Sequence, residues 1–145
     1  MRPAMWLIGA IAVGVGVVLG GASASAHHAF AAEFSAEHPV HFAEATITKV
    51  EWINPHAWFH VEVTQPNGEV ESWMIEAGNP FNLFRRGFSR DVIKVGMVVT
   101  IDGYQATDGS NRANGRDMRL PDGTTLFMGS SGTGAPSDGR DPTER

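Results

Sequence analysis

The stretch that decides the fold is AWFHVEVTQPNGEVESWMIEA, residues 57–77. On both sides of Pro66-Asn67-Gly68, apolar side chains alternate with polar ones, which is typical of strands with one apolar face. Proline suits the first central position of a type I turn, and glycine suits the left-handed residue that completes a three-residue loop. The stretch therefore predicts an antiparallel β-hairpin.

The length of this loop also predicts the register of the hairpin. With three residues in the loop, Phe59 lies opposite Ile75 on the inner face, and Trp58 lies opposite Glu76 on the outer face. A slip of one residue would place Glu76 inside the fold, opposite Phe59, where an unpaired carboxylate is strongly unfavourable. We therefore expect a single register.

The segments on either side of the hairpin predict further strands and one helix. Residues 43–52 alternate with a phase change of one residue, which indicates a long strand with a β-bulge. Asn79 can cap a helix that begins at Pro80, and Gly87 can end it. Later strands are expected at 97–104, 116–120 and 124–128, with a polar loop at 106–115.

This order of elements predicts an all-β fold, a small OB-like Greek-key barrel with one short helix between strands 3 and 4. A β-sandwich or a plain six-stranded barrel fits the pattern nearly as well. The expected organisation is a signal peptide at 1–26, a mature N-terminal segment at 27–37, the OB-like barrel domain at 38–128 and a flexible C-terminal tail at 129–145.

The N-terminal residues are typical of a secretory signal peptide. Arg2 precedes an apolar run from Met5 to Leu19, and small residues follow up to Ala24-Ser25-Ala26, a pattern that signal peptidase accepts. A membrane-spanning helix needs about 20 apolar residues, more than this run supplies. We therefore expect cleavage after Ala26 and a periplasmic or secreted protein that is not anchored in the membrane.

Composition argues against two classes of function. Arg2 is the one charged residue among the first 26, so the rest of the chain carries 16 acidic and 10 basic side chains, a net charge of −6. A general nucleic-acid-binding protein is normally basic, so we expect no nucleic-acid partner. The chain has no cysteine, and no serine lies in a nucleophile elbow. The sequence therefore favours a binding or accessory protein over an enzyme, and we assign no catalytic residue.

Five short stretches carry a resemblance to a known family. They are HHAF at 27–30, EWINPH at 51–56, LFRRG at 83–87, DGSNRA at 108–113 and GSSG at 129–132. In these stretches the chain resembles a family of small exported bacterial proteins, domain of unknown function 6152. The resemblance implies export and a single compact β-domain, and it implies no activity.

The mouth of the predicted barrel is the first candidate site. In OB-like folds the loops between strands 1 and 2 and between strands 4 and 5 flank the usual ligand surface. Here these loops are residues 53–56 and 106–116. The candidate ligand-binding residues are Asn54, His56, Trp58, Asn111, Arg112 and Arg116. Their amide, guanidinium and indole groups suit a sugar or a small anion, although turn geometry and local ion pairs also explain residues of these types.

The second candidate is a copper site at the mature N-terminus. Cleavage would leave His27 with a free amine, and this amine and its imidazole could chelate copper together. His28 could add a ligand, as could His56, His60, His38 or His41, and zinc is an alternative metal. His56 and His60 would lie about 13 Å apart on a straight strand, so they need a bend to share one ion. The alternative is a frayed terminus without a metal.

A basic patch near the predicted helix is the third candidate. It consists of Arg85, Arg86, Arg90 and Lys94. This patch could meet an acidic partner or a phosphate, so a further hypothesis is an interaction partner of an envelope complex. The alternative is a solvated helix end without a partner.

Overall fold

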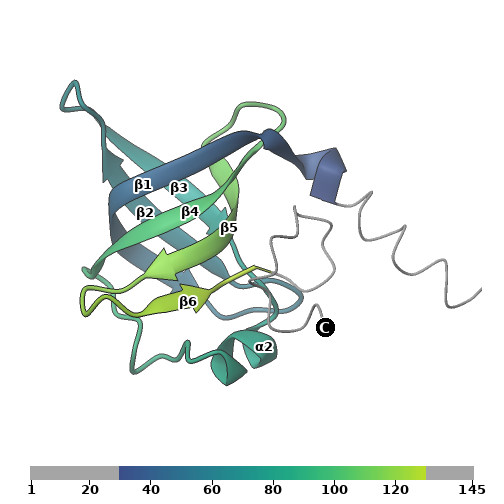
Figure 1. The fold of residues 1–145 in the computed structure, drawn as a ribbon, viewed down its shortest axis with the longest axis vertical. Coiled ribbons are helices and arrows are strands. Elements are labelled where there is room, and N and C mark those ends of the chain that lie inside the picture. The colour runs from purple at the N-terminus through teal and green to yellow at the C-terminus, as the bar shows by residue number, and fades with distance from the viewer. Residues whose placement is uncertain (1–29, 130–145) are drawn as a thin grey trace, which may run out of the picture.

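The computed structural model describes residues 30–129 of the chain. Within these residues six strands form one sheet that closes on itself (Figure 1). The strands are β1 (Phe34–Glu51), β2 (Trp58–Thr64), β3 (Val70–Glu76), β4 (Val98–Ala106), β5 (Arg112–Arg119) and β6 (Thr125–Phe127). A short helix, α2 (Pro80–Arg85), lies between β3 and β4.

The strand order identifies the barrel. The sheet runs β3-β2-β1-β4-β5-β6, and an additional parallel pairing joins β3 to β5. This pairing closes the ring β1-β2-β3-β5-β4, which is the Greek-key order of an OB-like barrel. The predicted all-β fold with one short helix between strands 3 and 4 is therefore confirmed. In Figure 1 α2 lies at the lower end of the barrel.

The hairpin forms in the predicted register. Phe59 pairs with Ile75, and Trp58 pairs with Glu76. Gly68 adopts a φ of 87°, the left-handed conformation that the loop requires. The predicted β-bulge is also present, as an irregularity in the pairing of β1 with β2 between Ile47 and Lys49.

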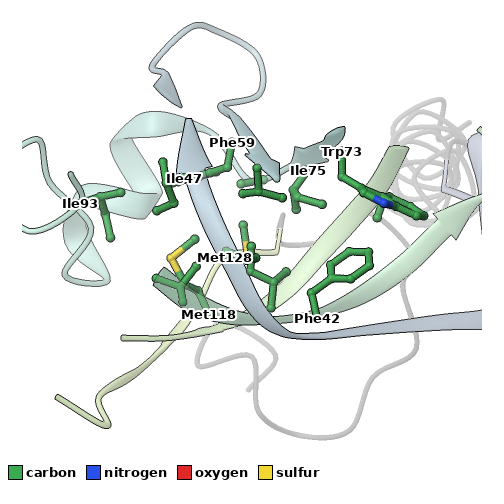
Figure 2. Packing of buried hydrophobic residues seen from close by; sticks show 14 of the residues in the cluster. Phe42, Ile47, Phe59, Trp73, Ile75, Ile93, Met118 and Met128 are labelled. Atoms are coloured by element: carbon green, nitrogen blue, oxygen red, sulfur yellow. The ribbon is translucent and has the colours of Figure 1, made fainter. Parts of the chain in front are cut away.

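Inward-facing side chains from every strand of the ring fill the barrel (Figure 2). Phe59 is fully buried, and its ring lies close to the rings of Trp52 and Phe88, at centroid distances of 5.8 and 5.9 Å. Leu83 of α2 is also fully buried and belongs to the same core. The helix therefore closes one end of the barrel.

The capping pattern of α2 agrees with the prediction. The side chain of Asn79 accepts a hydrogen bond from the backbone N–H of Phe81 at 2.9 Å, and Pro80 is the first helical residue. Gly87 follows the helix with a φ of 99°, a conformation that side chains with a Cβ rarely adopt. Local sequence signals therefore determine both ends of this helix.

The loop between β4 and β5 is shorter than predicted. It spans residues 107–111, because β5 already begins at Arg112. Asn114-Gly115 has the composition of a turn, but Gly115 is required in the strand: a Cβ there would lie 2.7 Å from Cγ2 of Ile75 and Sδ of Met128. The prediction of a loop up to residue 115 was therefore wrong. At the other end of the chain, β1 begins at Phe34, four residues before the expected start of the barrel domain.

Truncation of Phe59 tests which side chains face the core and which face solvent. We expect Phe59→Ala to lower the free energy of unfolding by about 3–5 kcal/mol, because it removes a fully buried aromatic side chain. Phe81→Ala removes a ring that is 66 % exposed, so it should change stability by less than about 0.5 kcal/mol. Urea denaturation of both variants provides the measurement, and equal losses would contradict the assignment of inner and outer faces.

Candidate functional site

A row of polar and aromatic side chains crosses the outer face of the barrel. The register places Trp58 of β2 opposite Glu76 of β3, Glu76 beside Asn114 of β5, and Asn114 opposite Tyr104 of β4. The residues on either side of Trp58, Glu76 and Asn114 are buried in the core, so these three side chains point away from it. The parallel pairing of β3 with β5 makes this row continuous.

Glu76 is the central residue of the row, and it is buried although it faces outward. The residue is 6 % exposed. Its Oε1 atom lies 3.0 Å from Nδ1 of His56, and the same oxygen accepts a long hydrogen bond from Nδ2 of Asn114 at 3.5 Å. A carboxylate that is removed from water requires such partners, because its desolvation is unfavourable.

The surroundings of Glu76 also change its proton affinity. Burial raises the pKa of Glu76 above its ordinary value near 4.5. His56 and Arg112 oppose this rise, and the carboxylate of Glu33 adds to it. His56 belongs to the loop between β1 and β2, and Arg112 is the first residue of β5. Charged groups from three separate segments therefore act on one carboxyl group.

Two phenylalanines at the start of the described chain pack against Tyr104, the residue of the row that lies on β4. Phe30 and Phe34 form a second apolar cluster with Tyr104, outside the main core. The rings of Phe30 and Tyr104 meet edge to face at a centroid distance of 5.7 Å. Glu33 lies between the two phenylalanines in sequence, so this packing brings its carboxylate into the surroundings of Glu76.

Three of the six predicted ligand-binding residues meet at Glu76. Nδ1 of His56 lies 3.0 Å from the carboxylate, Arg112 acts on it electrostatically, and Trp58 is the cross-strand neighbour of Glu76. Trp58 and Arg112 are half-buried, and the side chain of His56 is 37 % exposed. Solvent therefore reaches the groups around the buried carboxylate of Glu76.

The other three predicted residues make contacts elsewhere. Oδ1 of Asn54 accepts a hydrogen bond from Nδ2 of Asn79 at 2.8 Å, which joins the β1–β2 loop to the start of α2. The backbone carbonyl of Asn111 accepts a hydrogen bond from the N–H of Met74 at 3.0 Å. Nη1 of Arg116 donates to the phenolic oxygen of the tyrosine in the row at 3.2 Å. The partners named here for these three residues are groups other than Glu76.

The sequence interpretation missed three residues of this site. Glu76 was expected on the outer face, but its burial was not predicted. Asn114 was placed in the candidate loop at 106–116 but not among the six ligand-binding residues, and Glu33 was not a candidate. One signal was available for Asn114. The strand order of an OB-like barrel pairs strand 3 with strand 5 in parallel, so residues of strand 5 were to be expected beside Glu76.

Three of the four histidines within residues 30–129, namely His41, His56 and His60, each contact a different carboxylate. Besides the His56 pair, Nε2 of His60 lies 2.8 Å from Glu51, and Nδ1 of His41 lies 2.7 Å from Asp102. Between residues 30 and 129, no group of three or more histidine, aspartate or glutamate side chains is placed to hold a metal ion.

The N-terminal predictions fall outside residues 30–129. His27 and His28 lie there, as does the expected signal peptide, so the copper site and cleavage after Ala26 stay predictions. No helix within the described part of the chain is long and apolar enough to cross a membrane.

Comparison with known proteins shows a similarity to a protein family. A family model described as a family of unknown function (DUF6152) matches residues 15–115, more than half of the chain. The matched range contains all the charged residues that act on Glu76. Neither a curated protein nor a solved structure matches the chain.

The burial of Glu76 predicts how stability changes with pH. Because its pKa is raised in the folded state, the folded protein holds a proton that the unfolded chain has already released. The contribution of Glu76 to stability is therefore present at low pH and is lost as the pH rises from about 4.5 through the raised pKa. Relative to the parent protein, Glu76→Gln should gain stability over this rise, measured as the melting temperature at each pH.

Glu62→Gln is the matched control, because Glu62 is exposed on β2. We expect its melting temperature to follow that of the parent protein across the same pH range. Parallel curves for Glu76→Gln and the parent protein would contradict a raised pKa of Glu76 in the folded state.

Proposed function

The chain belongs to the family of unknown function DUF6152, and we propose that it is an exported, single-domain binding or accessory protein. Its ligand would bind on the outer face of β2, β3 and β5. We call this region the Glu76 site, and it consists of His56, Trp58, Glu76, Arg112 and Asn114. Export to the periplasm or beyond is part of the proposal, and it is supported by the sequence pattern of residues 1–26.

The outward-facing but buried carboxyl group of Glu76 is the observation that carries this proposal. Carboxylates are rarely buried, and perturbed carboxyl groups are concentrated at functional sites. Glu76 lies on the face of strands 2 and 3 and beside the two loops that OB-like folds use for their ligands. His56 and Arg112, which act on this carboxyl group, are themselves partly open to solvent, so a ligand can reach them.

The chemistry of the Glu76 site indicates the kind of ligand. Arg112 and His56 can donate hydrogen bonds to an anionic or hydroxyl oxygen, and Glu76 can accept one from a hydroxyl group. Trp58 supplies a flat apolar surface, and Met74, two residues before Glu76 on the same face, is 36 % exposed. A sugar or a small carboxylate fits this combination of groups.

A copper protein is the second candidate, and one geometric observation favours it. Nδ1 of His56 faces the carboxylate of Glu76, which leaves Nε2 for another partner. Histidines that bind metals usually hold a carboxylate or carbonyl with their other ring nitrogen in this way. In this alternative His56 would complete a copper site with the amine and imidazole of His27.

A nuclear magnetic resonance titration tests the first proposal. The probes are a panel of neutral sugars, sugar acids and small dicarboxylates, and the readout is the indole N–H signal of Trp58 and the side-chain signal of Arg112. We expect Arg112→Ala to weaken binding about tenfold or more, because a charge-assisted hydrogen bond contributes about 1.5–3 kcal/mol. Arg119→Ala removes an exposed arginine from the same strand and should leave binding unchanged.

Cu(II) separates the two candidates. If copper is the ligand, its affinity should fall by orders of magnitude when one residue is added before His27, because the extension removes the chelating amine. A ligand that binds through the Glu76 site should be insensitive to this extension. Loss of Cu(II) binding on extension, together with no response of Trp58 to any member of the panel, would contradict the first proposal and support copper.

A further inference from the structure

Large apolar side chains are exposed together at the α2 end of the barrel. Phe81 is 66 % exposed, Phe84 is 45 % exposed, and Ile53 in the β1–β2 loop is 52 % exposed. The hydrogen bond between Asn54 and Asn79 holds this loop against the start of α2. The loop and the helix therefore present one surface, although they are far apart in the sequence.

Two arginines are held over aromatic rings on the same surface. The guanidinium carbon of Arg85 lies 5.8 Å from the centroid of the Phe81 ring, and that of Arg90 lies 6.0 Å from the ring of Trp52. Within residues 30–129 no carboxylate is paired with either arginine. We call the surface formed by Ile53, Phe81, Phe84, Arg85 and Arg90 the α2 face.

The predicted basic patch is divided by the structure. Arg86 points toward the last strand, where its Nη1 donates to the carbonyl of Gly129 at 2.6 Å and its guanidinium lies 4.8 Å from the centroid of the Phe127 ring. Lys94 lies 3.7 Å from the exposed Asp91. Arg85 and Arg90 therefore supply the positive charge of the α2 face, in a chain whose formal net charge is −5.

We propose that the α2 face docks on an anionic phospholipid surface. Exposed phenylalanine side chains beside arginines are typical of proteins that insert into the headgroup region of a bilayer. The positive charge complements anionic headgroups, and the apolar side chains can enter the region below them. The helix α2, which carries Phe81, Phe84 and Arg85, lies at one end of the long axis of the molecule (Figure 1).

This proposal is independent of the Glu76 site. None of the residues of the α2 face belongs to that site, so a failure of one proposal leaves the other intact. An acidic protein partner would also complement the charge of the α2 face. Vesicles contain no protein, so a failure of the α2 face to bind them would favour the protein partner.

The chain contains no cysteine, so a single introduced cysteine can carry a polarity-sensitive fluorophore. Phe81→Cys places the label on the α2 face. Val70→Cys places it at a position that is 59 % exposed, beside the β2–β3 loop at the opposite end of the barrel (Figure 1). Both positions are exposed, so neither label disturbs the core, and the dispersion of the amide spectrum of each variant verifies the fold.

The labelled full-length proteins are mixed with vesicles of phosphatidylcholine alone or of an equimolar mixture with phosphatidylglycerol. We expect the emission of the label at position 81 to rise several-fold with the anionic vesicles, and to return toward its starting value at high salt, which screens the attraction. The label at position 70 should not respond. Binding through the apolar run Met5 to Leu19 would persist after charge reversal at Arg85 and Arg90, so the charge-reversed protein described below controls for it.

Charge reversal completes the test. Adding Arg85→Glu and Arg90→Glu to the Phe81→Cys protein should abolish the response to anionic vesicles. The proposal is overturned if the label at position 81 does not respond, if it responds equally to phosphatidylcholine alone, or if charge reversal leaves the response unchanged.

Discussion

The parallel pairing of β3 with β5 is the constraint on which the rest of the structure depends. It closes the sheet, with the N–H of Met74 bound to the carbonyl of Asn111 at 3.0 Å. The closed barrel also needs glycines on β4 and β5, where the backbone and the core approach closely. A Cβ on Gly103 would collide with the carbonyl oxygen of Asn114, and one on Gly115 would collide with Ile75. A larger residue at either glycine would therefore disturb the pairing of the strands around it.

Closure also creates the electrostatic conditions of the Glu76 site. Without the pairing, Glu76 would be a strand residue on an outer face that is open to water. The pairing places β5 beside it, and Asn114 and Arg112 come with that strand. The carboxyl group is then removed from water, and its raised pKa and its need for His56 follow from that removal. Fold and candidate site thus have one physical origin.

The sequence predicted the features that depend on neighbouring residues. The turn at Pro66-Asn67-Gly68 determined the hairpin register, and Asn79 and Gly87 determined the ends of α2, because these signals act over a few residues. The burial of Glu76 depends on contacts with a strand that begins 36 residues later in the chain. Asn114-Gly115 was interpreted as a turn for the same reason. Gly115 is required because Ile75 and Met128 pack against it, and neither residue is a neighbour of Gly115 in the sequence.

Native-state hydrogen exchange at the amide of Met74 tests most directly whether closure holds the barrel and the Glu76 site together. The matched reference is the amide of Ile47, which donates to the carbonyl of Met97 at 2.9 Å on the far side of β1. If closure is integral to the fold, both amides exchange through global unfolding, with the same opening free energy. Exchange of Met74 through a local opening of much lower free energy, while Ile47 stays protected, would contradict that view.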